Sequence, residues 1–434
     1  MTSSSWKKCK ISDIKAPISH SLVGGPFGSN LVSHDYTPSG IPVIRGQNMG
    51  FGRWIGGEFV FISQQKAEKL SANIARPHDL IFTQRGTIGQ VSVVPEKPYH
   101  EYVISQSQMK VTVDHSKTDV IFLYYLFKTP EQQEFIKQNA IQTGVPHTNL
   151  EHLRNTPIKL PLLAEQHNIA RILGSLDDKI DLNRQMNETL EAMARVIFQS
   201  WFVDFDPVRA KVERRDTGLP PEIAALFPDG FEEVDGREVP RGWEAKPLDQ
   251  IATFLNGLAL QKYPPDGEDY LPVIKISQLR KGDTEGSDKA SGDISSEYIV
   301  DDGDVLFSWS GSLDVVIWCG GKGALNQHLF KITSDRYPKW FYYLWALHHL
   351  PDFRLIAEGK ATTMGHIQRH HLSDAMVLVP SEKQMRAMNK TLESLINKII
   401  SNKVESRTLA QIRDALLPKL MSGEIEMRFE KTLR

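Results

Sequence analysis

Polar side chains suited to hydrogen bonding gather in loop-like stretches of this chain, and they form two sets. Arginine can make two hydrogen bonds to guanine, and asparagine or glutamine two to adenine, in the major groove of DNA. Lysine, serine and threonine suit phosphates. The first set is Arg45, Gln47, Asn48, Gln84, Arg85, Thr87, Gln106, Gln108, Thr143, His147, Thr148 and Asn149. The second set is Lys275, Ser277, Gln278, Ser308, Trp309, Ser310, Gln327, His328, Lys360, Thr362, Thr363 and His366.

For any single residue of these sets, hydrogen bonding within its loop or to water is an equally good explanation. The prediction of nucleic-acid binding therefore depends on the recurrence of the sets. Corresponding positions differ in residue type, as in the pairs Arg45 and Lys275, Gln84 and Trp309, and Arg85 and Ser310. One scaffold that carries two different sets of polar side chains predicts two different targets.

Catalytic patterns are weak by comparison. Asp352, Glu358 and Lys360 imitate a nuclease metal site, but two-metal chemistry needs acids that converge on an ion, and here a short helical spacer separates them. His366 and His370 have the spacing of a zinc helix without its glutamate. We therefore predict no metal site.

Other catalytic signatures are missing from the sequence. The glycine-rich stretch from Gly24 to Ser29 lacks the lysine and hydroxyl residue of a phosphate loop and predicts a tight turn. Neither a nucleophile elbow nor the asparagine-proline-proline-aromatic run of amino-methyltransferases occurs. We predict that no residue of this chain is catalytic.

The elements that carry these residues repeat once along the chain. IPVIRGQNM (Ile41 to Met49) resembles LPVIKISQL (Leu271 to Leu279), and DLIFTQRGTIG (Asp79 to Gly89) resembles DVLFSWSGSLD (Asp304 to Asp314). The clearest match keeps a constant offset: Ser175, Leu176, Lys179, Ile180, Asn183, Thr189 and Leu190 recur as Ser394, Leu395, Lys398, Ile399, Asn402, Thr408 and Leu409. Each repeat therefore predicts a globular module followed by a long helix.

β-Branched and aromatic runs interrupted by Gly, Pro and Asn, with helices over residues 121–139 and 340–358, predict mixed α/β modules. We expect a first module over residues 1–160, a long helix over 161–205, a connector over 206–240, a second module over 241–380, a second long helix over 381–422, and a tail over 423–434. The connector is acidic and rich in proline, with no long helical period.

The long helices carry heptad patterns typical of a coiled coil. The first stripe is Ile169, Leu176, Asn183, Leu190 and Ile197, flanked by Ile172, Leu173, Ile180, Met186 and Met193. The second is Met388, Leu395, Asn402, Leu409 and Leu416, flanked by Ile399 and Ile412. Ser381 and Gln384 predict a capping box at the start of the second helix.

One asparagine stands at the third of the five positions in each stripe. A buried asparagine lowers stability but fixes the register, because only a hydrogen-bonding partner satisfies it. We predict that Asn183 and Asn402 lie close together at the centre of an antiparallel coiled coil. Replacing both with leucine should raise thermal stability. The alternative is that both face solvent and the register is shifted by one stripe.

Composition narrows the class of protein. The chain has 434 residues, with 51 Lys and Arg against 53 Asp and Glu, so a basic surface must be local or shared with partners. Two cysteines, Cys9 and Cys319, exclude a disulfide framework. The start lacks a secretory signal and no run of about 18 apolar residues occurs. These features predict an intracellular, cytoplasmic protein without a membrane segment.

The chain resembles the specificity subunit of type I restriction-modification systems. The repeated architecture carries the resemblance together with TGVPHTNL (Thr143 to Leu150), IKLPLLAEQHNIARILGSLDDKID (Ile158 to Asp181), SWFVDFDPV (Ser200 to Val208), PRGWEAKPLDQIA (Pro240 to Ala252) and LLPKLMSGEI (Leu416 to Ile425). The second module departs from the first at TTMGHIQ (Thr362 to Gln368), where His366 matches His147 but the proline is lost.

The resemblance implies two target-recognition domains that bind the two halves of a split, asymmetric sequence in double-stranded DNA, with a coiled coil that sets the gap. It implies a non-catalytic chain that binds no cofactor. Two methyltransferase subunits would use S-adenosylmethionine to methylate adenine, and restriction subunits would use ATP and Mg²⁺. Apolar residues near the end of the first coil helix, Ile197, Phe198, Trp201 and Phe202, are a candidate docking site for a methyltransferase, with core packing as the alternative. The rival functions are a stand-alone DNA methyltransferase or nuclease, and a coiled-coil scaffold.

Overall fold

The computed structural model describes residues 6–50, 52–141, 145–234, 236–265, 267–359 and 365–425. Its contacts divide the chain into two units. The first unit comprises Met1–Asp181 and Thr408–Arg434, and the second comprises Leu182–Arg407. Two long helices, α6 (Leu163–Phe198) and α13 (Glu382–Met421), contribute residues to both units. Their bounds fall within the helical ranges that the sequence predicts.

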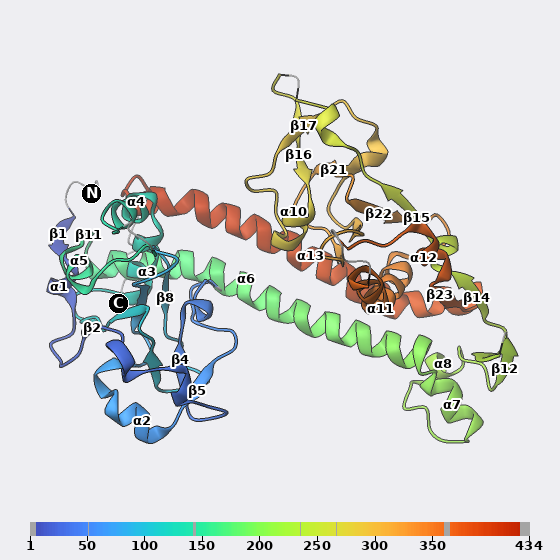
Figure 1. Ribbon diagram of the computed structural model, residues 1–434, viewed down its shortest axis with the longest axis horizontal. Coiled ribbons are helices and arrows are strands. Elements are labelled where there is room, and N and C mark those ends of the chain that lie inside the picture. The colour runs from blue at the N-terminus through green and yellow to red at the C-terminus, as the bar shows by residue number, and fades with distance from the viewer. Residues whose placement is uncertain are drawn as a thin grey trace, which may run out of the picture. The chain divides into compact units, whose positions relative to one another are not determined.

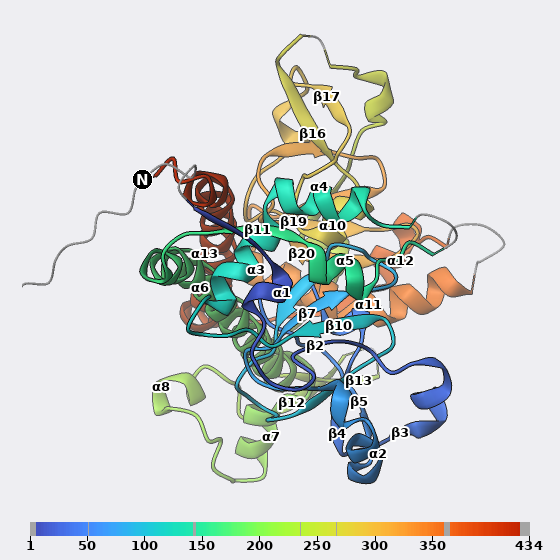
Figure 2. The same cartoon turned by 90° about the vertical axis from the view of Figure 1, so that its left-hand side faces the viewer.

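Two sheets form the first unit. A four-stranded antiparallel sheet has the order β2-β10-β7-β8 (Leu22–Gly24, Gln108–Val111, Leu80–Thr83, Val91–Val93), and β2, β10 and β7 run side by side in Figure 2. A five-stranded sheet has the order β3-β5-β4-β9-β6 (Tyr36–Thr37, Val60–Ile62, Ile41–Ile44, Tyr102–Ile104, Ile74–Ala75). A pair of strands, β1 (Lys7–Lys10) and β11 (Pro157–Leu160), closes the module. The helices are α1 (Ile11–Ile14), α2 (Gln64–Lys69), α3 (Val120–Lys128), α4 (Pro130–Gln138) and α5 (Leu150–Asn155).

The second unit repeats this plan, as the sequence predicts. Its first sheet has the order β15-β22-β19-β20 (Thr253–Asn256, Leu329–Thr333, Val305–Ser308, Asp314–Ile317). Its second sheet has the order β17-β16-β21-β18 (Lys289–Ser291, Tyr270–Ile274, Gly323–Leu325, Ile299–Val300), and the pair β16 and β21 is parallel, like β4 and β9. The closing strands are β14 (Glu244–Pro247) and β23 (Met376–Val379). The helices are α9 (Leu248–Ile251), α10 (Ile276–Lys281), α11 (Lys339–Glu358) and α12 (Arg369–Asp374).

The single helix expected over residues 121–139 is two helices, α3 and α4. Proline cannot donate a backbone hydrogen bond, so it suits the first turn of a helix better than the interior. Pro130 begins α4, and the Thr129 side chain caps it by accepting a hydrogen bond from Gln132 N. In the second unit, α11 continues through Pro351 without a break.

The connector packs more tightly than its composition suggests. It holds α7 (Asp206–Val212), α8 (Pro221–Ala224) and a hairpin of β12 (Phe231–Val234) and β13 (Arg237–Pro240). A turn of π-helix, Gln199–Val203, joins it to α6. Phe198, Trp201 and Phe202 are buried in the aromatic core of the second unit. The prediction of a methyltransferase docking site at these three residues is therefore wrong, because they pack inside the chain.

The heptad stripes lie largely inward. The buried residues include Ile169, Leu173, Met388 and Ile399. The flanking residues Met193 and Ile412 are exposed, so the prediction that they help to form the contact between the two helices is wrong. The capping box at the start of α13 is confirmed, since Ser381 N donates to Gln384 Oε1 at 2.9 Å. At the other end of α13, Leu417, Leu420 and Met421 join the core of the first unit. The predicted tail lies mostly outside the described residues.

Candidate nucleic-acid interface

In the first unit, the loop after β7 is fastened to the segment that precedes α5. Arg85 forms an isolated antiparallel bridge with His147. Thr148 N donates to Gln84 O at 2.9 Å, and Gln84 N donates to Ser107 O at 2.7 Å. These backbone bonds bring together residues from three predicted stretches and fix the path of the loop.

In the second unit, the loop after β19 is fastened in the same way. Ser310 forms an antiparallel bridge with His366, and Ile367 N donates to Trp309 O at 3.0 Å. The correspondence between His147 and His366 is confirmed. The loss of the proline before His366 leaves this backbone pairing intact.

The exposure of the first set varies from residue to residue. Gln47, Arg85, Thr87 and Gln106 are exposed. The half-buried members are Arg45, Gln84, His147 and Asn149, and the buried members are Asn48, Gln108 and Thr148. Thr143 lies outside the described residues, as do Lys360, Thr362 and Thr363 of the second set.

Several members of the first set hold the scaffold from inside. Asn48 Oδ1 accepts a hydrogen bond from Arg45 N at 3.0 Å, and Asn48 Nδ2 donates to Glu58 O at 2.8 Å. Gln108 is fully buried and accepts the hydroxyl of Ser105. Direct base contact by these two amides is a prediction that the structure contradicts, because neither reaches the surface.

Three more members of the first set have structural partners. Asn149 caps α5 by accepting from His152 N at 2.8 Å. Gln106 Nε2 donates to Leu31 O at 3.0 Å. Thr148 is buried beside the loop, with its hydroxyl 3.5 Å from His152 Nδ1, so direct base contact by Thr148 is also contradicted.

The second set divides similarly. Ser277 is exposed, and Lys275, Trp309, Gln327, His328 and His366 are half-buried, whereas Gln278, Ser308 and Ser310 are buried. Ser308 Oγ donates to Ser312 O at 2.7 Å and accepts from Asp314 N at 2.8 Å. Gln278 Oε1 accepts from Ser277 Oγ at 2.8 Å. Gln278, Ser308 and Ser310 are therefore corrected from base contacts to supports of their loops.

Aromatic rings cluster around the loop of the second unit. The Trp309 ring lies 6.0 Å from the His328 ring and 5.8 Å from the Phe330 ring, between centroids. Trp309 Nε1 donates to Asn256 Oδ1 at 2.9 Å, and Ser310 Oγ lies 3.0 Å from His328 Nδ1. Asn256 was not predicted, since a single asparagine at a strand end gives no signal of its own.

The comparisons with known proteins decide the family. The type I restriction modification DNA specificity domain matches residues 31–192 and 240–411. The chain belongs to this specificity family. It is 25% identical to the type I restriction enzyme MjaIX specificity subunit of Methanocaldococcus jannaschii over 97% of this chain and 94% of that protein. It is 28% identical to the HindI specificity subunit of Haemophilus influenzae over 75% of this chain and 81% of that protein.

A solved structure supports the fold of this specificity-family chain. The S subunit of a type I restriction-modification system from M. genitalium superposes with a TM-score of 0.56 over 96% of each chain, at 16% identity. At this identity the likeness concerns the fold alone. The tandem α/β modules and the two long helices that the sequence predicts are confirmed.

The polar layer of the helix pair lies in the second unit, where α6 and α13 run antiparallel (Figure 1). Asn183 and Asn402 are both fully buried, and Asn183 Nδ2 lies 3.4 Å from Asn402 O. The prediction that these two residues lie close together is confirmed. Asn402 Nδ2 donates to Asn187 Oδ1 at 2.9 Å. Asn187 was missed, although it lies one helical turn after Asn183 and therefore on the same face.

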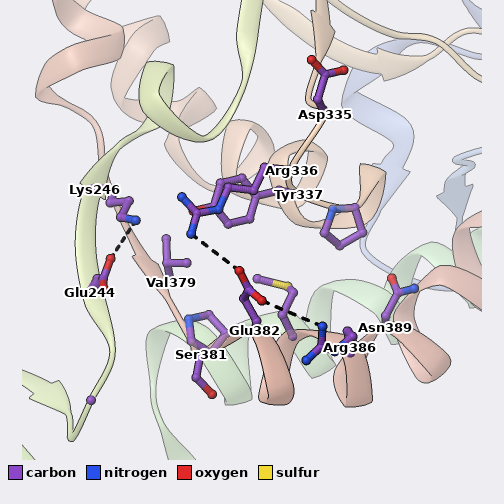
Figure 3. A pocket seen from close by; sticks show the side chains of 14 residues that line it. Glu244, Lys246, Asp335, Arg336, Tyr337, Val379, Ser381, Glu382, Arg386 and Asn389 are labelled. Atoms are coloured by element: carbon purple, nitrogen blue, oxygen red, sulfur yellow. Dashed lines mark ion pairs between the residues drawn. The ribbon is translucent and has the colours of Figure 1, made fainter.

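A hollow of about 700 Å³ lies beside the start of α13 (Figure 3). Its charged walls pair internally: Lys246 with Glu244 at 2.7 Å, and Arg336 and Arg386 with Glu382, each at 3.9 Å. None of the predicted recognition residues lines it. The hollow is therefore separate from the candidate interface.

His349 of α11 packs against an aromatic ring. His349 Nε2 lies 3.0 Å from Met376 O, and its ring stacks on Trp345. Burial, followed by the neighbouring His348, lowers the pKa of His349 to about 4. Among the described residues, no group of three or more His, Cys, Asp or Glu could hold a metal ion.

No helix in the described part of the chain is both long and apolar enough to cross a membrane.

Proposed function

We propose that the chain is the non-catalytic subunit that selects the DNA sequence for a type I restriction-modification complex. Each unit binds one half of a split, asymmetric site in double-stranded DNA through the loops after β7 and β19. Two methyltransferase subunits, which use S-adenosylmethionine, then methylate adenine at that site. Restriction subunits use ATP and Mg²⁺ to cleave DNA that lacks the methyl groups. This chain itself binds none of these cofactors.

One observation carries the proposal. Two loops share a backbone pairing, Arg85 with His147 and Ser310 with His366, but present different side chains. The phosphate backbone of DNA is the same at both halves of a split site, while the bases differ. A duplicated backbone with divergent side chains is what two base-reading loops require. The names of the relatives, all specificity subunits of type I restriction enzymes, favour the same function.

The helix pair supports a fixed gap between the two halves. A rigid connection makes the second contact effectively intramolecular, which raises overall affinity without new contacts. Removing seven residues from each helix, at positions opposite one another, shortens the pair by about 10 Å. At about 3.4 Å per base pair, the gap should shrink by roughly three base pairs, or binding should fail.

Sequencing of modified bases tests the proposal. DNA from cells that contain the chain and its methyltransferase partners should carry methyladenine in a split motif, and the motif should disappear when the chain is deleted. A stand-alone methyltransferase predicts methylation by the purified chain without partners. A coiled-coil scaffold predicts an unchanged pattern after deletion. Either of the last two results would contradict the proposal.

A further inference from the structure

Arg85 and Ser310 hold the same place in the two loops. Each is the residue that bridges to the histidine of the opposite segment, His147 or His366. Because the backbone pairing is the same, the side chains start from equivalent points. The difference between the two residues is therefore a difference in what the two loops present, not in how they fold.

A phosphate contact does not explain this difference. Both halves of a DNA site offer the same phosphates, so a position that grips the backbone has no reason to lose its charge in one unit. A position that faces a base edge must differ when the two half-sites differ. The change from Arg85 to Ser310 fits contact with a base.

The two residues also differ in their exposure to solvent and in their side-chain contacts. Arg85 is exposed, and its guanidinium makes no hydrogen bond or ion pair with any residue that the structure describes. Its backbone is fixed by the bridge to His147 and by the bond from Arg85 N to Ser107 O at 3.3 Å. Ser310 is buried, and its hydroxyl lies 3.0 Å from His328 Nδ1. Only the first loop offers an open guanidinium on a fixed backbone at this position.

We propose that Arg85 recognises a guanine in the half-site bound by the first unit. This inference rests on the proposed function, which it makes specific. The planar guanidinium donates two hydrogen bonds to guanine O6 and N7 in the major groove, a pattern that no other base presents. The half-site of the second unit is read without a cation at the corresponding position, where Ser310 is turned inward.

Chemically altered guanines test the contact in the complex of the chain with its methyltransferase partners. 7-Deazaguanine lacks the N7 acceptor, whereas inosine keeps both N7 and O6. We expect 7-deazaguanine at one position of one half-site to weaken binding roughly 10-fold or more. Inosine at the same position should have little effect. In the Arg85→Ala complex, 7-deazaguanine at that position should cause no further loss.

Variants separate base recognition from charge. In cells, Arg85→Ala should make one G·C pair of one half-site degenerate in the methylated motif and leave the other half unchanged. Arg85→Lys keeps the charge but not the fork, so it should relax the same position. Arg171→Ala removes an exposed arginine of α6 outside the loop and serves as the matched control, with an unchanged motif. Thermal melting checks that each variant is folded.

The outcomes distinguish this inference from the proposed function. An unchanged motif in Arg85→Ala, or a uniform loss at all sites with no relaxed position, overturns the guanine contact while the split motif of the unaltered chain stands. If the position relaxed by Arg85→Ala is not a G·C pair, the inference is likewise wrong. If the unaltered chain gives no split motif, the proposed function fails, and the inference fails with it.

Discussion

The two units fasten the C-terminal part of α13 with different chemistry. In the first unit, Arg413 donates to Asp177 Oδ1 at 2.7 Å, and Tyr125 Oη donates to Asp177 Oδ2 at 2.5 Å. Asp177 is buried there. In the second unit, Arg407 binds both oxygens of Asp302 at 2.6 Å, with both side chains about a quarter exposed.

This difference shows which contacts a duplicated fold retains. The sheet order, the bridge between loops and the apolar helix faces recur because they share one backbone. An ion pair depends only on the charged groups of two side chains, so it can differ between the units without a change in the backbone. The energetic consequences differ too, because a buried charge that loses its partner cannot regain water.

Loss of the buried junction should have the largest effect. Arg413→Ala removes the ion pair of the buried Asp177, which keeps the hydrogen bond from Tyr125 and the more distant charges of Arg53 and Lys128. Breaking a buried ion pair costs about 3–5 kcal/mol. We expect hydrogen exchange in α3 to accelerate strongly, while helix α11 of the second unit stays protected. Hydrogen exchange with mass spectrometry measures both helices in one sample.

The matched variant in the second unit is Arg407→Ala. Its partner Asp302 can rehydrate, so the loss should be about 1 kcal/mol or less. Measured by the same exchange experiment, a loss as large as that of Arg413→Ala would contradict the distinction between the junctions.

Acid should weaken the second unit through His349. Its pKa is about 4 in the folded chain, well below its ordinary value, because burial disfavours the charged ring. The unfolded chain binds the proton first as pH falls. This contribution to stability is therefore complete above about pH 6.5, declines between about pH 6.5 and 4, and is constant below. At about 1.4 kcal/mol per pH unit, the loss is roughly 3–4 kcal/mol.

The variant His349→Phe isolates this histidine. It keeps an aromatic ring against Trp345 and removes the titrating group, so thermal melting between pH 7 and 4 should fall less steeply than in the unaltered chain. An equal slope for the two proteins would show that other groups dominate the acid response.

The sequence predicts the elements that depend on repetition and periodicity. The heptads predict α6 and α13, although the first predicted helix runs past the end of α6 at Phe198, and the aligned runs predict the paired modules. Exposure of the polar residues was not predictable, because Asn48 and Arg85 belong to similar loops and only the folded chain shows which side chain turns inward. Asn187 was missed because the prediction considered residues at one heptad position only, whereas the interface of a coiled coil is formed by two heptad positions, a and d.

The polar layer of α6 and α13 belongs to the second unit, and its removal should separate stability from register. Asn402→Leu alone deprives Asn187 of its donor, and an unsatisfied buried amide costs about 1–3 kcal/mol. Replacing Asn183, Asn187 and Asn402 together with leucine removes the three buried amides, including Asn402 Oδ1, which finds no partner among the described residues. Glu405 and Ser406, which accept from Asn183, are only part-buried and can turn toward water. The triple variant should therefore melt at a higher temperature than the unaltered chain, since well-packed apolar residues often replace buried polar ones with a gain.

The exposed variant Gln185→Leu is the control for added apolar surface and should leave melting unchanged. The register should loosen in the triple variant, because the buried asparagines that favour one alignment are gone. Spin labels placed at Glu191 and Lys403, whose Oε1 and Nζ atoms lie 3.1 Å apart, report that alignment through the spread of distances between the labels. A triple variant that melts lower, or that keeps as narrow a distance distribution as the unaltered helices, would show that packing rather than the asparagines determines the pairing.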